Sequence, residues 1–114
     1  AYGAELIAMK DLLNLYYGCD SSSLYAAMTS VPNYRYSMGP DSFEHRFLHE
    51  DVCSTLVPAT ELAELAGIKV PLIDALISII SAVTQKNLKA QGRSLEQLGL
   101  AGMDAQEVFA YVNS

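Results

Sequence analysis

The chain has 114 residues, of which 51% are hydrophobic and 18% are charged. This is enough for one globular domain with its own core, and the composition excludes an intrinsically disordered chain. The formal net charge of −6 disfavours nucleic acid as a partner, because an acidic surface repels the phosphate backbone. Two cysteines, Cys19 and Cys53, are too few for a disulfide framework, so we expect a reducing, cytoplasmic environment.

The first residues do not have the pattern of a signal peptide. Residues 1–4 run directly into a helical pattern, without the charged and apolar regions of a signal peptide. We therefore expect 1–114 to be a piece of a longer chain. The most apolar stretch, residues 70–83, contains Asp74 and is too short to cross a bilayer, so we expect no membrane partner.

Apolar residues recur at helical spacing in the first third of the chain. The pattern predicts one helix over residues 3–17, ended by Gly18, and a second over residues 24–29, capped by a serine. Residues 31–40 are expected to form a loop, because prolines, an asparagine and a glycine punctuate them.

Residues 41–66 should contain two further helices. We expect the first of them to be capped by Asp41 or Ser42 and to carry on through residue 56. Pro58 is expected to break it, because proline lacks the N–H that the interior of an α-helix uses. A short helix should then begin at Thr60 and stop at Gly67.

The last third of the chain carries clear signals for helix starts. A proline suits a first helical turn and predicts a helix over residues 71–85. Ser94 with Gln97, and Asp104 with Glu107, have the spacing of capping boxes, which predicts a single turn and a final helix. Strand-like alternation is nowhere sustained, so the predicted fold class is all-α, a compact multi-helix domain.

Reactive side chains gather in residues 45–53, which hold two imidazoles, one guanidinium and two carboxylates. In the plainest interpretation they form the solvent-exposed face of an amphipathic helix, with Arg46 and Glu50 as an ordinary surface ion pair. His45 and His49 have the spacing of two zinc ligands, but no Glu follows the first His as in a hydrolytic zinc site, and we expect no metal.

A third interpretation is a segment that grips a substrate. The planar fork of Arg46 matches a carboxylate with two parallel hydrogen bonds, and Asp51 could orient a histidine. On a straight helix these two side chains point about 140° apart, at roughly 100° per residue. They share one cleft only if the helix ends or bends between them.

The order of the motifs favours this third interpretation. Residues 46–52 resemble the Arg-aromatic-x-x-Glu-Asp-Val signature of the C-terminal domain of octopine/nopaline dehydrogenases, the opine dehydrogenase family. Residues 56–63, 67–75 and 92–100 resemble later segments of that family in the same order. Family members often have proline after the signature, where this chain has Cys53.

The resemblance implies a two-domain, NAD(P)H-dependent enzyme that reductively condenses an amino acid with a 2-oxo acid. This chain would be its substrate-binding domain, similar to the C-terminal-like helical domain of 6-phosphogluconate dehydrogenase. By position, Arg46 would hold a substrate carboxylate and Asp51 would be the catalytic acid that orients a histidine outside this chain. Glu50, Tyr34 and Arg35 would bind substrate as well, although a packed loop explains the latter two equally.

NAD or NADP would be bound by an N-terminal nucleotide-binding domain outside this chain, since the sequence contains no Gly-x-Gly-x-x-Gly fingerprint. The fragment alone should therefore be inactive.

Two alternatives remain open. One is a non-catalytic interaction module that buries residues 70–83 against a partner, for example in a homodimer. The other is the helical half of another two-domain enzyme, such as a ketopantoate reductase or a 2-hydroxyacid dehydrogenase. Asp74 would either stabilise a helix N-terminus or contact substrate. Cys53 is expected to be a structural thiol whose pKa is raised by Glu50 and Asp51.

Overall fold

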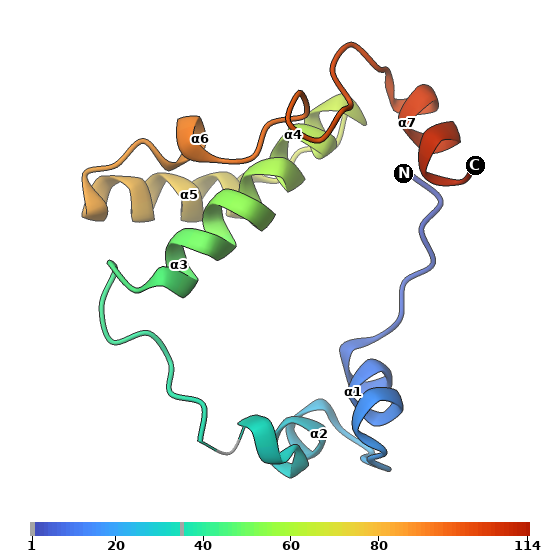
Figure 1. Cartoon of the computed structure of the whole chain (residues 1–114), viewed down its shortest axis with the longest axis vertical. Helices are drawn as coiled ribbons and strands as arrows, with labels where there is room; N and C mark the ends of the chain where they lie inside the picture. The colour runs from blue at the N-terminus through green and yellow to red at the C-terminus, as the bar shows by residue number, and fades with distance from the viewer. Residues whose placement is uncertain (1, 35) are drawn as a thin grey trace. The chain divides into compact units, whose positions relative to one another are not determined.

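The computed structural model describes residues 2–34 and 36–114, and all regular secondary structure among them is helical (Figure 1). This confirms the all-α prediction. The chain divides into two compact units, of which the first contains Pro40–Ser114 with the N-terminal residues up to Gly3, and the second contains Ala4–Gly39. No helix in the described ranges has the length and apolar character needed to cross a membrane.

The second unit consists of α1 (Met9–Tyr17), α2 (Leu24–Ser30) and a short 3-10 turn, η1 (Pro32–Tyr34). Its small core is formed by three buried side chains: Leu13, Ala27 and Val31. The predicted second helix is confirmed, and the Ser23 hydroxyl caps it by accepting the Ala26 N–H at 3.1 Å.

The predicted start of the first helix, at residue 3, is wrong. Helix α1 begins only at Met9, because Ala8 has an extended backbone with ψ of 138° and Gly3 has a left-handed φ of 69°. Neither conformation can belong to a right-handed helix. The expected end is confirmed, since Gly18 adopts the left-handed conformation that terminates α1.

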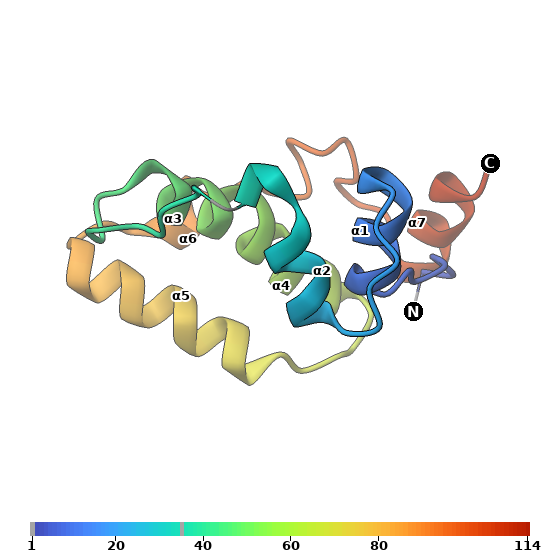
Figure 2. The same cartoon turned by 90° about the horizontal axis from the view of Figure 1, so that it is seen from below.

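In the first unit, α3 (Arg46–Asp51), the π-helix η2 (Val52–Leu56) and α4 (Val57–Leu65) follow one another without interruption. After them come α5 (Pro71–Thr84), α6 (Leu88–Gln91) and α7 (Ala105–Val112). Figure 2 shows α5 along one edge of this unit. Side chains from η2, α4, α5 and α6 form the core, and they are Val52, Cys53, Val57, Ile77, Ile80 and Leu88.

Pro58 does not break the helix as predicted, because the backbone changes register before it. The N–H of Val57 donates to the carbonyl of Val52, five residues back, which widens the turn. The next bond in this register would run from Pro58 to Cys53, but proline has no N–H. The N–H of Arg93 donates to the Cys53 carbonyl instead, at 2.7 Å, so the segment after α6 is fastened to the π-helix.

The helix predicted to start at Asp41 or Ser42 starts later. His45 is the N-cap residue of α3, with an extended ψ of 134°, and its Nδ1 accepts the Phe47 N–H at 3.2 Å. The extended conformation of His45 prevents the helix from continuing toward its N-terminal side.

The two capping-box predictions are confirmed. Ser94 and Gln97 exchange backbone-to-side-chain hydrogen bonds of 3.1 and 3.3 Å around a single turn. Asp104 and Glu107 do the same at the start of α7, where the Asp104 carboxylate accepts the Glu107 N–H at 2.9 Å. Helix α5 spans the predicted residues, whereas the four-residue α6 was not expected.

Candidate functional site

Arg46 and Asp51 are the first and last residues of α3, and both are exposed. The register change that distorts this helical run begins only at Val52, after Asp51. Between the two residues the helix is regular, so their side chains point about 140° apart, at roughly 100° per residue. Helix α3 therefore does not bring the guanidinium and the carboxylate together.

The guanidinium of Arg46 lies over the ring of Phe47, with its central carbon 5.1 Å from the ring centroid. Among the described residues no ion pair joins Arg46 to Glu50, so the surface pair of the plainest sequence interpretation is not formed. A cation in the first turn of a helix also gains nothing from the helix dipole, which favours anions there. Helix stability therefore does not explain an arginine at this position.

The other predicted substrate contacts are dispersed. Glu50 lies on α3, four positions after Arg46 and on the same side of the helix, and it is exposed. Tyr34 belongs to the second unit, at the end of η1, where its ring meets that of Tyr17 edge-on at 6.1 Å. A side-chain hydrogen bond with Tyr17 raises the pKa of Tyr34 above its ordinary 10.0. Arg35 lies outside the described residues.

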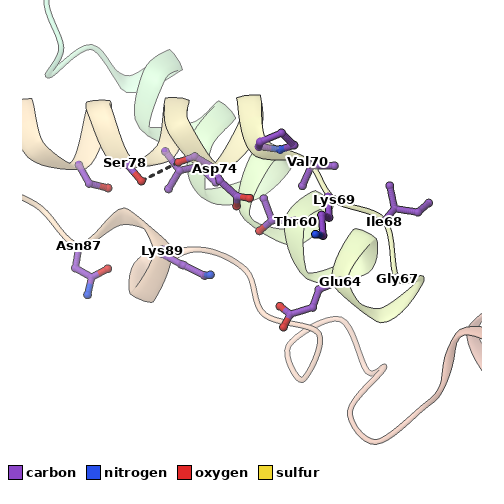
Figure 3. Close-up of a pocket in the computed structure, with 13 residues that line it drawn as sticks. Thr60, Glu64, Gly67, Ile68, Lys69, Val70, Asp74, Ser78, Asn87 and Lys89 are labelled. Carbon is purple, nitrogen blue, oxygen red and sulfur yellow. Dashed lines mark hydrogen bonds between the residues drawn. The ribbon is translucent and has the colours of Figure 1, made fainter.

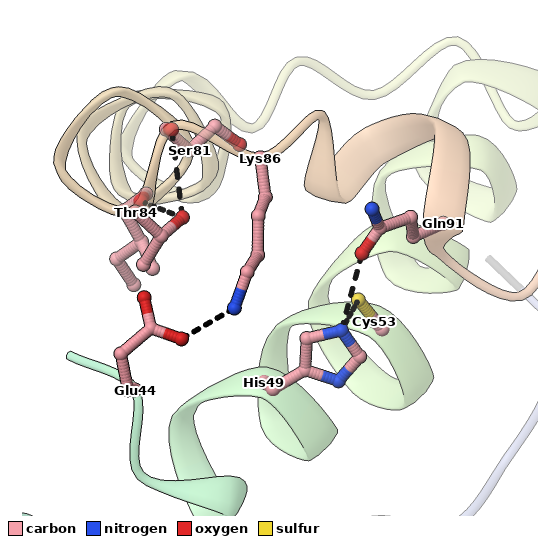
Figure 4. A network of polar contacts seen from close by, with 8 residues as sticks. Glu44, His49, Cys53, Ser81, Thr84, Lys86 and Gln91 are labelled. Carbon is pink, nitrogen blue, oxygen red and sulfur yellow. Dashed lines mark hydrogen bonds and ion pairs between the residues drawn. The ribbon is translucent and has the colours of Figure 1, made fainter.

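A small polar network joins α3 and η2 to α6 (Figure 4). The Nε2 atom of His49 lies 3.2 Å from Gln91 Oε1 and 3.8 Å from Cys53 Sγ, and the Cys53 thiol donates to the carbonyl of Leu88. Burial raises the pKa of Cys53. A raised pKa was expected, but its cause is burial and not the acidic neighbours. Because the thiolate is the reactive form, we expect the Cys53 thiol to be inert.

No group of three His, Cys, Asp or Glu side chains in the described part of the chain is placed to hold a metal ion. His45 and His49, the pair singled out by their spacing, have different partners. The ring of His45 packs edge-on against Phe47 at 4.7 Å, while His49 faces Gln91.

Comparison with known proteins identifies the family. Residues 1–84 match the family described as NAD/NADP octopine/nopaline dehydrogenase, alpha-helical domain. The chain belongs to this family. An opine dehydrogenase from Arthrobacter sp. (strain 1C) is 38% identical over 78% of the chain and 25% of its own length. A D-nopaline dehydrogenase from Agrobacterium tumefaciens (strain T37) is 33% identical over 87% of the chain and 24% of its own length.

A further relative, the protein ocs of Agrobacterium tumefaciens (strain Ach5), is 31% identical over 86% of the chain and 27% of its own length. The chain thus spans about a quarter of the length of these relatives. The predicted family resemblance is confirmed, and the matched residues include the motifs at 46–52, 56–63 and 67–75.

The family is named for NAD or NADP, but the residues of this chain do not fit a dinucleotide. Dinucleotide sites of the common type need a strand followed by a glycine-rich turn and a helix. The sequence has no Gly-x-Gly-x-x-Gly, and residues 2–34 and 36–114 contain no strand. We therefore assign no residue of this chain to the cofactor.

A groove of about 860 Å³ is bounded by α4, α5, α6 and the loop before α5 (Figure 3). It is lined by Thr60, Glu64, Gly67, Ile68, Lys69, Val70, Pro71, Asp74, Ile77, Ser78, Ser81, Asn87 and Lys89. Arg46, Glu50 and Asp51 are not among these residues. Of the groove residues only Asp74 was considered as a possible ligand contact from the sequence, although residues 67–71 belong to the same family-like segment.

Asp74 is not a capping residue. Val70 occupies the N-cap position of α5, and no side chain caps this helix. The carboxylate of Asp74 lies in the first turn, where the helix dipole favours an anion, and it faces the groove. Both sequence interpretations of Asp74, dipole stabilisation and ligand contact, are therefore compatible with its position.

Proposed function

We propose that this chain is the substrate-binding helical part of an NAD(P)H-dependent opine-type dehydrogenase, which reductively condenses an amino acid with a 2-oxo acid. The family match over residues 1–84 supports the class of enzyme. The relatives' length, about four times the matched part, supports a separate N-terminal nucleotide-binding domain. That domain would bind NAD or NADP, which supplies the hydride, and this chain alone would be inactive.

The observation that carries the substrate role is the exposed guanidinium of Arg46, which has no carboxylate partner within the described residues. Both proposed substrates have a carboxylate, and the guanidinium fork can donate two parallel hydrogen bonds to it. The Phe47 ring below the guanidinium limits its motion, because a cation within about 6 Å of a ring face is attracted to it. An anionic ligand would thus bind a guanidinium whose orientation is already restricted.

Asp51 would act on a different group. It lies roughly 7.5 Å from Arg46 along the helix axis, at 1.5 Å per residue, and on another side of the helix. We assign Asp51 to a histidine from the remainder of the protein. The carboxylate would orient this histidine and stabilise its protonated form. Glu50, on the same side as Arg46, would accept a hydrogen bond from the substrate ammonium. Tyr34 and Arg35 stay predictions as further hydrogen-bond donors to substrate carboxylates.

The test is steady-state kinetics of the full-length protein with Arg46→Lys, which keeps the charge and loses the fork. The KM for the oxo acid should rise about tenfold, as expected when one charge-assisted hydrogen bond is lost. Arg93→Lys is the matched control, because Arg93 is also exposed and lies outside the proposed site. Equal KM values in the two variants would remove Arg46 from the site.

A second candidate function, an interaction module, is favoured by the outer side of α5. Four apolar side chains on that side are 80%, 49%, 56% and 52% exposed, and they are Leu72, Leu76, Ile79 and Val83. Their spacing places them on one stripe of the helix. If two copies pair through this stripe, Leu76→Ser should shift a sedimenting dimer toward monomer. A wild-type protein that is monomeric at all concentrations would remove this candidate.

A further inference from the structure

We propose that His49, Cys53 and Gln91 form a binding site for a thiophilic divalent cation such as zinc. The proposed dehydrogenase assigns no role to these three residues. In the signature at residues 46–52, His49 occupies a variable position, and Cys53 stands where family members often have proline. The inference therefore goes beyond the proposed function and does not depend on it.

The three ligand atoms come from two segments that pack against each other (Figure 4). His49 and Cys53 lie on the continuous run of α3 and η2, while Gln91 is the last residue of α6. The Nε2 atom of His49 is the common neighbour, 3.8 Å from Cys53 Sγ and 3.2 Å from Gln91 Oε1. A cation at this point would join α6 to the helical run that contains the π-helix.

These separations match those of ligands that share one zinc ion. With Zn–S of about 2.3 Å and Zn–N and Zn–O of about 2.1 Å, tetrahedral angles place S and N about 3.6 Å apart and N and O about 3.4 Å apart. The measured distances of 3.8 and 3.2 Å each differ from these values by about 0.2 Å, which a small side-chain rotation can supply. The Leu88 carbonyl oxygen, 3.7 Å from Cys53 Sγ, is the candidate fourth ligand.

The two strongest ligands differ in exposure, which suits the capture of an ion from solvent. His49 is exposed, whereas only 6% of Cys53 is exposed. A cation would therefore bind the imidazole first and reach the sulfur from that side. Glu44 and Lys86 line a small cavity next to His49, but they form an ion pair, so the lysine leaves no unbalanced positive charge there.

Binding of the cation would release one proton. Without a cation, the Cys53 thiol donates to the Leu88 carbonyl, and the neutral ring of His49 can donate from Nε2 to Gln91. A metal ion binds the thiolate, so the thiol proton leaves to solvent. The imidazole stays neutral, because its proton moves to Nδ1. Since two of the four ligands are uncharged oxygens, we expect weaker binding than at a structural zinc site built from thiolates and imidazoles.

The first experiment titrates the reduced full-length protein with Co²⁺, which can take the place of Zn²⁺ and reports its ligands by absorption. A sulfur ligand gives a charge-transfer band in the near ultraviolet. We expect this band in the wild type, its loss in Cys53→Ser, and an affinity at least about tenfold lower in His49→Gln. Zn²⁺ should displace the Co²⁺ and abolish the band.

Cys19→Ser and His45→Gln are the matched controls, because they make the same changes at the other cysteine and the other histidine of the chain. Both should keep the wild-type band and affinity. No band in the wild type, or a band that persists in Cys53→Ser, would overturn the proposal. A wild-type affinity in His49→Gln would overturn it as well. Circular dichroism checks that every variant remains helical.

The second experiment looks for a gain of affinity, which a misfolded variant would not give. Gln91→Glu replaces the amide oxygen by a charged carboxylate, so Co²⁺ should bind about tenfold more tightly at a pH where the imidazole is neutral. Gln97→Glu is the matched control, since it adds the same charge at an exposed position outside the site. An equal affinity of Gln91→Glu and wild type, or an equal gain in both variants, would overturn the assignment of Gln91 as a ligand.

Discussion

Gly92, the C-cap residue of α6, lies against the core residue Val57. A β-carbon added at this position would be 2.5 Å from both Cβ and Cγ1 of Val57, and Val57 is completely buried. The backbone of Gly92 itself is unstrained for any residue, with φ of −70° and ψ of 161°. Gly92→Ala therefore tests close packing alone, without a conformational penalty.

The expected cost has two sources. Overpacking a filled core by one methyl group costs about 1–3 kcal/mol. If the segment moves away to relieve the overlap, it stretches the 2.7 Å bond from the Arg93 N–H to the Cys53 carbonyl, and a buried carbonyl without a partner costs about 1–3 kcal/mol. We expect a loss of at least about 2 kcal/mol in the free energy of unfolding, or a fall in Tm of roughly 10 °C.

Urea unfolding followed by far-ultraviolet circular dichroism measures this loss. Gly39→Ala is the matched control, since nothing lies within 4 Å of a β-carbon at Gly39 and its φ is not in the left-handed region. It should leave the midpoint unchanged or raise it slightly. If Gly92→Ala unfolds at the same urea concentration as the wild type, the described contact between Gly92 and Val57 is incorrect.

Three further predictions concern other parts of the first unit. Leu88→Ala removes a side chain that is 1% exposed and should cost about 2–5 kcal/mol in urea unfolding, more than the exposed Leu72→Ala. Asp104→Ala should cost about 1 kcal/mol and speed amide hydrogen exchange at Gln106 and Glu107, whose N–H groups it caps. Cys53 should be alkylated more slowly than Cys19, because Cys53 is buried. The raised pKa of Cys53 should make the free energy of unfolding fall as the pH rises above 9.0, and Cys53→Val should lack this loss.

The elements predicted correctly have their determinants within a few residues. Pro71 at the start of α5, the capping box of α7 and the glycine that ends α1 each act on their own turn. The π-helix was missed because its register depends on Pro58 and on a donor at Arg93, far along the chain. Sequence periodicity carries no information on such a bond.

The sequence indicates which residues could form a site, but not how they are arranged. The family signature and the chemistry of Arg46 and Asp51 could be read from the sequence, and both residues are exposed. Their orientation depends on where the helix distorts, which the tertiary contacts decide. The groove was missed for the same reason, because its charged residues come from four segments that only the folded core brings together.

The most direct test of the proposed enzyme is the identity of the product formed by the full-length protein. With NAD(P)H, an amino acid and a 2-oxo acid, mass spectrometry should find a secondary amine. Its mass should be the sum of the two substrates minus one water plus two hydrogens. NAD(P)H should be consumed only when both substrates are present. Consumption with the oxo acid alone, yielding a 2-hydroxy acid, would contradict the account and indicate a hydroxyacid dehydrogenase.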